Sequence, residues 1–114
     1  MPGELVMVND TNYEEFLRNE RAVLVFSRST CESCAEYIDG IGSLLASPEM
    51  AGVAFGKIVL DKPGSLNIKR TNTWIADLEF LPHTVLFRQG RMVEEFDASN
   101  ASYLEERVRE ILLV

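Results

Sequence analysis

The sequence is poor in side chains that hold metal ions. It contains two cysteines, Cys31 and Cys34, and one histidine, His83. A structural zinc site takes four ligands, so one chain has too few thiols and imidazoles to complete such a site by itself. A zinc site within the chain is therefore disfavoured, and a site shared between two subunits stays open as a weaker alternative.

Clusters of basic residues are also missing. The chain has 18 acidic and 11 basic residues, which gives a net charge of -7, and its lysines and arginines form no continuous stripe. Nucleic-acid affinity needs clustered cations that release counterions from phosphates, so we expect no nucleic-acid partner. A net charge of this size favours solubility and a monomer.

Long apolar runs are absent as well. No stretch approaches the roughly 18 to 20 apolar residues of a membrane helix, so we expect no membrane attachment. The segment 1–10 contains Glu4 and Asp10 and lacks the basic and apolar parts of a secretory signal. These absences predict a cytoplasmic protein. In a reducing cytoplasm, two close cysteines are more often catalytic or metal-binding than a structural disulfide.

The remaining composition is that of an ordinary globular protein. Of the 114 residues, 46% are hydrophobic and 25% are charged, close to the average for globular domains. A chain of this length buries roughly two thirds of its unfolded surface in one core. We therefore predict a single domain over residues 1–114, with no linker, internal repeat or low-complexity segment.

Hydrophobic patterning in the first half predicts strands that alternate with helices. A short edge strand at 6–8 precedes a helix whose opening, at 11–14, matches a capping box. The continuously apolar segment 22–26 is typical of a strand buried on both faces. From 34 to 45, apolar residues recur at helical spacing, and two glycines weaken that helix by roughly 1 kcal/mol each relative to alanine.

The second half continues this alternation. Its predicted elements are a strand, a helix, a hairpin and a last helix, at 53–60, 68–75, 84–87 with 92–96, and 102–113. Gly90 provides a positive φ in the hairpin turn, and Ser99 or Asn100 caps the last helix. We expect Trp74 to pack into the core. The element order β-α-β-α-β-α-β-β-α predicts an α/β fold with helices on both faces of a mixed sheet.

Cys31 and Cys34 lie between a buried strand and a helix. Two thiols separated by two residues at a helix start can close a small disulfide ring and reopen it with little backbone change. The helix N-terminus favours the reactive thiolate through its unpaired N–H groups. We predict that Cys31, nearer the helix end, attacks and that Cys34, one turn inside, resolves the mixed disulfide. A lone C-x-x-C pair also occurs in zinc sites, in structural disulfides and by chance, but the strand-to-helix context favours redox chemistry.

A second candidate element is the segment Leu81-Pro82-His83-Thr84, which leads directly into the hairpin. Proline lacks the N–H that a strand ladder uses, so it fits a strand start where that edge faces a groove. The residues alone leave both isomers of the Leu81–Pro82 bond open, and trans is the commoner one for an arbitrary X-Pro bond.

In this order, the segments resemble the thioredoxin family over nearly the whole chain. The matching features are 23–26 ahead of C-x-x-C, 57–61 as a strand ending in Asp, Leu81-Pro82 before the hairpin, and 87–90 at its turn. The resemblance implies a thioredoxin fold, which is a three-layer α/β/α arrangement with a central mixed sheet flanked by four helices. It also implies a redox-active disulfide and no metal or organic cofactor.

The resemblance further implies roles and partners. Cys31 attacks, Cys34 resolves, and Pro82 is a cis proline whose preceding residue, Leu81, offers backbone hydrogen bonds to a bound substrate segment. Together with Thr30, these two residues form the expected substrate groove. The implied partners are client proteins with disulfides and an electron donor similar to thioredoxin reductase.

Several positions depart from the family pattern. Thr30 replaces the Trp that usually precedes the first Cys, and Glu32-Ser33 replaces Gly-Pro as the active-site dipeptide. The segment between Asp61 and Pro82, which includes 65–79, is about six residues longer than usual. These departures are expected to alter redox poise and partner choice.

A further departure concerns proton transfer. Val25 occupies the position of the family's buried acid, although Lys57 matches the lysine that accompanies it, and His83 stands where Thr is common. One hypothesis is that Glu32, Glu36 or His83 exchanges protons with Cys34 instead. The alternative is that both glutamates are simply solvated residues of the helix start.

The same glutamates are expected to affect Cys31. At about 7 Å and an effective dielectric near 20, a carboxylate opposes a thiolate by roughly 2 kcal/mol before solvent screening. The helix end favours the thiolate by about 0.3 to 1 kcal/mol. We therefore predict that Cys31 is less acidic than in a typical family member and that its disulfide is harder to reduce.

Two functions of different classes remain open. The first is a protein-disulfide oxidoreductase. The second is a thioredoxin-fold binding or adaptor module that keeps the groove near Pro82 while its cysteines are vestigial or redox-sensing. The loss of the Trp, the Gly-Pro pair and the buried acid argues for the second.

Overall fold

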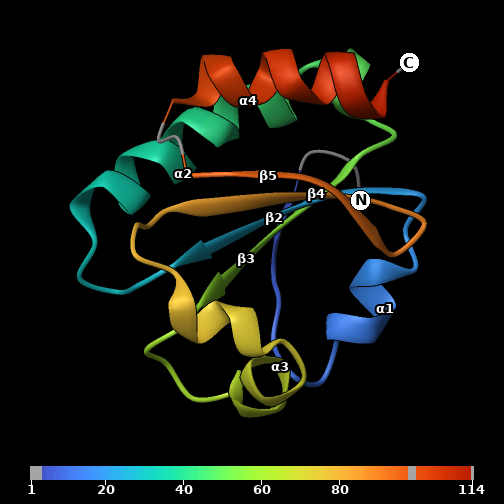
Figure 1. The fold of residues 1–114 in the computed structure, drawn as a ribbon. Coiled ribbons are helices and arrows are strands. Elements are labelled where there is room, and N and C mark those ends of the chain that lie inside the picture. The colour runs from blue at the N-terminus through green and yellow to red at the C-terminus, as the bar shows by residue number, and fades with distance from the viewer. Residues whose placement is uncertain (1–3, 98–99, 114) are drawn as a thin grey trace.

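The computed structural model describes residues 4–97 and 100–113 and shows a five-stranded sheet between two layers of helices (Figure 1). The strand order is β1-β3-β2-β4-β5, in which β1, β3 and β2 run parallel and β4 and β5 pair antiparallel. The strands are β1 (Leu5–Met7), β2 (Arg21–Ser27), β3 (Ala54–Val59), β4 (His83–Arg88) and β5 (Arg91–Phe96). The predicted mixed sheet is confirmed.

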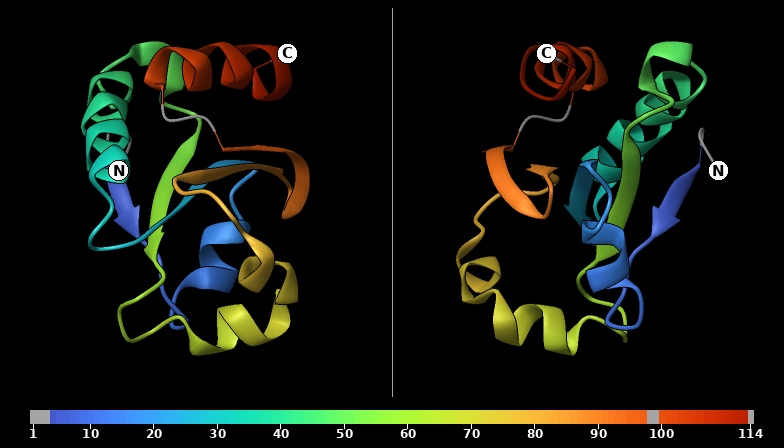
Figure 2. Two further views of the ribbon diagram at one scale, coloured as in Figure 1. Left: turned by 60° about the vertical axis from the view of Figure 1, so that its left-hand side comes forward. Right: turned by 90° about the vertical axis from the view of Figure 1, so that its right-hand side faces the viewer.

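Helices cover both faces of this sheet, as Figures 1 and 2 show, with α2 and α4 on one face and α1 and α3 on the other. The helices are α1 (Tyr13–Leu17), α2 (Glu32–Leu45), α3 (Leu66–Thr71) and α4 (Ala101–Arg107). Two 3₁₀ turns, η1 (Pro48–Met50) and η2 (Thr73–Asp77), follow α2 and α3, and a π-helical turn, η3 (Val108–Leu112), continues α4. The predicted three-layer α/β/α arrangement is confirmed.

The central strand β2 forms the floor of two hydrophobic cores. Its residues 22–26 are at most 1% exposed, because alternate side chains pack under opposite helical layers. Val23 and Val25 pack with buried side chains of α2 and α4. Ala22, Leu24 and Phe26 pack with those of α1, α3 and η2. The continuous apolar run therefore positions the end of β2, where the cysteine pair follows.

The segment after β3 is the least regular. The helix expected at 68–75 is two shorter pieces, α3 and η2, joined at Asn72. The Asn72 side chain donates to the Ile68 carbonyl at 2.9 Å and to the Tyr13 hydroxyl at 3.3 Å, so it ends α3 and ties it to α1. Trp74 packs against Phe26 with ring centroids 5.4 Å apart, and the prediction that it joins the core is confirmed.

Two helix starts differ in how well the sequence predicted them. The capping box expected at 11–14 is absent, because the Asn12 side chain accepts from the Asn9 N–H at 2.8 Å and makes no cap bond to α1. At α4, Asn100 accepts from the Ser102 and Tyr103 N–H groups, as one of the two predicted caps requires. The other candidate, Ser99, lies outside the described residues.

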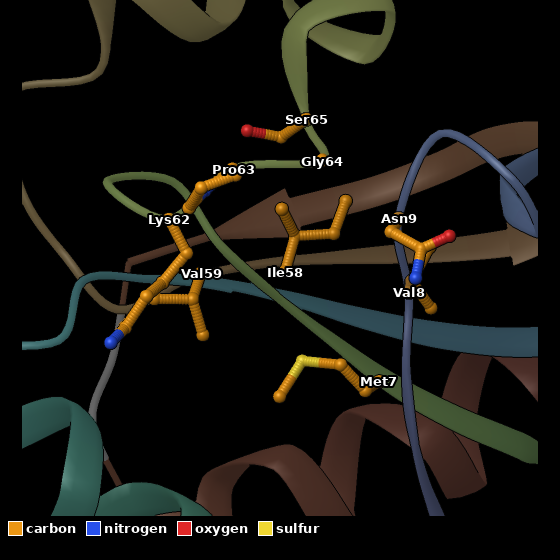
Figure 3. Close-up of a pocket in the computed structure, with 9 residues that line it drawn as sticks. All are labelled: Met7, Val8, Asn9, Ile58, Val59, Lys62, Pro63, Gly64 and Ser65. Carbon is orange, nitrogen blue, oxygen red and sulfur yellow. The ribbon is translucent and has the colours of Figure 1, made fainter.

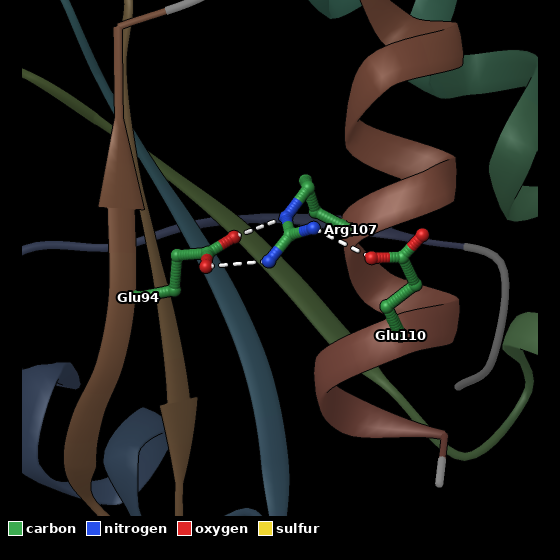
Figure 4. Close-up of polar contacts among 3 residues, drawn as sticks. All are labelled: Glu94, Arg107 and Glu110. Carbon is green, nitrogen blue, oxygen red and sulfur yellow. Dashed lines mark hydrogen bonds and ion pairs between the residues drawn. The ribbon is translucent and has the colours of Figure 1, made fainter.

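The hairpin and the last helix are fixed by local devices. Gly90 has φ 80, as predicted, and Gln89 precedes it with φ 52, which together give the turn the twist of its strands. Arg107 of α4 donates two hydrogen bonds to the Glu94 carboxylate on β5 and one to Glu110 (Figure 4). At Gly40, a Cβ would lie 2.9 Å from the Ala101 Cβ, so glycine lets α4 approach α2 closely.

Candidate active site

The two cysteines form a disulfide at the N-terminus of α2. Cys31 is the N-cap residue, with extended backbone angles, and its Sγ accepts a hydrogen bond from the Cys34 N–H at 3.1 Å. The two Cα atoms lie 5.2 Å apart. Because the first N–H groups of a helix lack partners within it, this sulfur takes the position that a capping oxygen usually holds. The same donor and the helix dipole favour a thiolate at Cys31 when the disulfide opens.

The two sulfurs differ in their access to solvent. Cys34 is 1% exposed, whereas Cys31 is half-buried. Glu32 and Ser33, between them, are both exposed, and the Ser33 Oγ lies 3.5 Å from the Cys31 Sγ. A disulfide partner from outside can therefore reach Cys31 first.

The loop before β4 lies beside the sulfur of Cys31, the more accessible of the two. The Leu81–Pro82 peptide bond is cis, as the family resemblance implied, and the Leu81 carbonyl oxygen is 3.8 Å from the Cys31 Sγ. Pro82 is buried, while Thr30 on the facing loop is exposed. Of the residues expected to form a substrate groove, Leu81 therefore contacts Cys31, and Thr30 precedes Cys31 in the chain.

The loop that carries Cys31 is held by the end of β3. The Asp61 carboxylate accepts from the Ser29 N–H at 2.9 Å and from the Ser29 hydroxyl at 2.5 Å. These two hydrogen bonds hold the pKa of Asp61 below its usual value. The Leu60 N–H also donates to the Ser27 carbonyl at 2.8 Å. Asp61 thus orients the loop just ahead of the cysteine pair.

The structure places His83, one of the residues proposed to exchange protons with Cys34, away from the cysteine pair. The His83 side chain lies on the sheet face that α1 and α3 cover, where its ring centroid is 6.5 Å from that of Phe26. Its Nε2 is 3.0 Å from a carboxylate oxygen of Glu95. Cys34 belongs to α2 on the opposite face, so His83 is not placed to exchange a proton with it. Glu36 is exposed on α2.

Behind the disulfide is a hollow of about 270 Å³ that opens between α2 and β3. Both cysteines line it, as do Arg28, Asp39 and Lys57. Lys57 pairs with Val25 across the β2–β3 ladder, which directs its side chain to the α2 face. The sequence reasoning assigned no role to Asp39. No local signal marked it, because five residues are about 1.4 helical turns and place Asp39 well away from the Cys34 face of α2.

Phe80 is a second residue that the sequence reasoning missed. Its side chain is 63% exposed, although it immediately precedes the Leu81–Pro82 bond. Large exposed aromatic side chains are enriched at protein interfaces, and Phe80 directly precedes Leu81, the residue that contacts Cys31.

A larger hollow of about 350 Å³ lies at the carboxyl ends of β1 and β3 (Figure 3). Residues 7–9, 58–59 and 62–65 line it with mostly apolar atoms, and neither cysteine reaches it. The buried Ser65 hydroxyl, at its rim, has no hydrogen-bond partner within the described part of the chain. Neither thiol lines this hollow, so the candidate active site is the one at the cysteines.

In residues 4–97 and 100–113, no three Cys, His, Asp or Glu side chains gather closely enough to hold a metal ion. No helix there has the length and apolar character needed to cross a membrane.

Comparison with known proteins shows the fold. Neither a family model nor a curated protein matches the sequence. Solved structures of thioredoxins do match: that from Malassezia sympodialis has a TM-score of 0.79 at 16% identity, covering 96% of this chain and 93% of its own. The Trypanosoma brucei brucei protein has 0.78 at 18%, covering 100% and 96%, and a mutant from Halobacterium salinarum has 0.77 at 20%, covering 96% and 91%. The chain therefore has the thioredoxin fold, with a cysteine pair at disulfide distance.

Proposed function

We propose that this protein is a thiol–disulfide oxidoreductase that reduces or exchanges disulfides in client proteins. The observation that carries the proposal is the asymmetry of the pair, because Cys31 is accessible at the mouth of α2 while Cys34 lies buried behind it. Such an arrangement gives one sulfur for attack and a second for resolution.

The reaction proceeds in two exchanges. The Cys31 thiolate attacks one sulfur of a client disulfide, and the other client sulfur leaves as a thiolate that takes a proton from water. Cys34 then loses its proton and attacks the Cys31 Sγ, which forms the Cys31–Cys34 bond and releases the second client thiolate. The client gains two electrons, and the protein gives them up as it becomes oxidised.

The groove around Cys31 supplies the client contact. The Leu81 backbone, beside the sulfur, pairs with an extended client segment, and Thr30 and Pro82 border it. Phe80 adds exposed aromatic area at the rim. Backbone pairing of this kind accepts varied sequences, which suits a reductase with several clients.

Regeneration requires an electron donor. The proposed donor is a reductase similar to thioredoxin reductase, which returns two electrons to the disulfide, so the protein itself needs no metal or organic cofactor. We assign the protein to the cytoplasm. We also propose that it is a monomer, since the net charge of -7 opposes self-association.

The competing function is a binding or adaptor module whose cysteines are vestigial or redox-sensing. The exposed Phe80 beside the groove suits that function as well, because it serves binding whether or not the disulfide turns over. The two functions differ in whether Cys31 is needed.

Insulin reduction with dithiothreitol separates them. Wild-type protein is expected to accelerate insulin precipitation over dithiothreitol alone, and Cys31→Ser is expected to run at the reagent's own rate. Cys34→Ser, which cannot resolve, is expected to accumulate mixed disulfides with its clients.

A wild-type rate equal to that of dithiothreitol alone would contradict the oxidoreductase. Partners that bind wild type and Cys31→Ser equally well, in that case, would support the adaptor.

A further inference from the structure

We propose that Asp39 and Lys57 form the proton-exchange pair for Cys34, acting through the hollow behind the disulfide. The inference rests on the proposed function and names the groups that serve its resolving step. It assigns to two charged side chains the task for which Val25, an apolar residue, offers no group.

The resolving step needs such groups because of where Cys34 lies. At 1% exposure, its thiol has almost no direct contact with solvent. Burial penalises the thiolate, so an isolated Cys34 would keep its proton and attack slowly. A proton acceptor within reach, directly or through one water, removes this obstacle.

The residues that line the hollow show which charged groups can reach the Cys34 thiol. Arg28 faces it from the loop after β2, Asp39 from α2 and Lys57 from β3. Arginine stays protonated in proteins, so Arg28 cannot take or give a proton there. The two exchangeable groups that remain are the carboxylate and the amine.

The other candidates are placed elsewhere. Glu32 and Glu36 are exposed on α2 and do not line the hollow. His83 pairs with Glu95 on the opposite face of the sheet. Neither group of candidates has a route to the Cys34 sulfur through this cavity.

Asp39 and Lys57 also have the arrangement that a relay needs. No carboxylate of the described residues forms an ion pair with Lys57, and Asp39 forms none with any base there. The two groups therefore face the cavity without neutralising each other, and its volume admits water. Asp39 is exposed and can pass a proton on to solvent, while half-buried Lys57 favours the thiolate electrostatically.

The proton leaves Cys34 by way of water and Asp39. In the mixed disulfide, a water in the hollow takes the Cys34 proton as it gives one of its own to the Asp39 carboxylate. The Cys34 thiolate attacks the Cys31 Sγ, the Cys31–client bond breaks, and the client leaves as a thiolate. Asp39 then releases its proton to solvent, and no further oxidant or reductant is needed.

The test is the rate of resolution as a function of pH. A mixed disulfide is formed between Cys31 and a thionitrobenzoate group, and release of thionitrobenzoate is followed by stopped flow between pH 5.5 and 8. Asp39→Asn is expected to slow release roughly tenfold at pH 6.5 and to change the pH profile, and Asp39→Glu is expected to restore most of the rate. Glu106→Gln removes a carboxylate charge from an exposed position on α4, outside the hollow, and is expected to match wild type.

A second measurement needs no client. In a Cys31→Ser background, the pH at which Cys34 reacts with a small alkylating agent reports its thiolate directly. Asp39→Asn is expected to shift this pH down by removing a negative charge, and Lys57→Met is expected to shift it up. Glu106→Gln is expected to leave it unchanged.

These results separate the inference from the proposed function. A release rate that Asp39→Asn leaves unchanged or increases overturns the proton-exchange pair, as does an equal effect of Glu106→Gln. An alkylation profile that neither Asp39→Asn nor Lys57→Met moves overturns it as well. A wild-type protein that resolves the mixed disulfide but reduces no protein disulfide contradicts the proposed function alone.

Discussion

The Cys31 Sγ and the Leu81 carbonyl oxygen lie 3.8 Å apart although 50 positions separate these residues in the chain. Strand pairing explains their meeting. Phe26, near the end of β2, is the antiparallel partner of His83 at the start of β4. The loop that leaves β2 and the loop that enters β4 must therefore meet at the same end of the sheet. The contact between Cys31 and Leu81 is a consequence of this register.

The first prediction concerns the acidity of Cys31. Glu32 is exposed at the first position of α2, next to the sulfur that the helix end stabilises as a thiolate. Glu32→Gln is expected to lower the pKa of the Cys31 thiol and to speed its alkylation at pH 7 about threefold, the size of an exposed charge effect of under 1 kcal/mol. The measurement is the alkylation rate of reduced protein across pH.

The control for this prediction is Glu106→Gln, which removes the same charge from an exposed position on α4. Its Cys31 rate is expected to equal that of wild type. The difference should shrink in 1 M salt, because screening is nearly complete there. An unchanged or slower rate in Glu32→Gln would refute the electrostatic explanation.

The second prediction concerns the loop held by Asp61. Hydrogen bonds from Ser29 hold the pKa of Asp61 below 3.8 in the folded protein. The stability that they contribute is therefore complete above about pH 4 and is lost as pH falls through this lower pKa. Asp61→Asn is expected to accelerate hydrogen exchange of the Ser29 amide severalfold at pH 7. In wild-type protein, hydrogen exchange of the Ser29 amide should accelerate in the same way, relative to the intrinsic rate of that amide, only on acidification.

The matched variant here is Asp77→Asn, at an exposed carboxylate in η2. It should leave the Ser29 amide as protected as in wild type. Equal protection in Asp61→Asn would show that the loop is held by other contacts.

The fold was predictable wherever one residue pattern had one structural solution. The run 22–26 is apolar at every position, and only a strand covered on both faces buries all of it. The cysteine pair that follows it could be placed at a helix start for the same local reason. The sequence therefore sufficed for the layers, the sheet type and the position of the disulfide.

The missed features depend on contacts between distant parts of the chain. The Asp10 carboxylate accepts from the Asn67 and Ile68 N–H groups and so caps α3 from 57 and 58 residues away. The Asp39 side chain gained a role only through the positions of α2 and β3 relative to each other. Neither relationship has a local signature, because each needs a tertiary packing that periodicity does not specify.

The third prediction compares two glycines. A Cβ at Gly56 would lie 2.7 Å from the Val8 Cγ2 and 2.8 Å from the Phe16 ring, so Gly56→Ala overpacks the core. We expect it to lower the free energy of unfolding by about 1 to 3 kcal/mol. Gly42 is exposed in α2 and has no atom within 4 Å of an added Cβ. Gly42→Ala is expected to raise the free energy of unfolding by about 0.5 to 1 kcal/mol.

Urea unfolding of both variants at pH 7 checks this pair. The two substitutions are expected to change the free energy of unfolding in opposite directions. A stabilised Gly56→Ala would contradict the close packing of β3 against α1.

The fourth prediction concerns stability at alkaline pH. Burial raises the pKa of Tyr37 to about 12, against a smaller opposing effect of its hydrogen bond with Thr84. The unfolded chain loses this proton near pH 10. The stability that the protonated Tyr37 phenol contributes is therefore complete below pH 10 and is lost as pH rises to about 12. It amounts to roughly 3 kcal/mol. Tyr37→Phe is expected to reduce the loss of stability between pH 9 and about 11.5.

Urea unfolding of the oxidised protein at these pH values measures the effect. Burial also raises the pKa of Tyr13, so Tyr13→Phe serves as the comparison and should change the alkaline slope less. A Tyr37→Phe slope equal to that of wild type would mean that the phenol ionises equally easily in the folded and unfolded states.

The central claim is that the exposed sulfur attacks and the buried sulfur resolves. Its most direct measurement is the reaction of reduced Cys34→Ser and reduced Cys31→Ser with an excess of a peptide disulfide at pH 7, followed by intact-protein mass spectrometry. The structure predicts that Cys34→Ser forms a mixed disulfide at Cys31 at least tenfold faster than Cys31→Ser forms one at the 1%-exposed Cys34. Equal rates, or a faster reaction at Cys34, would contradict the account.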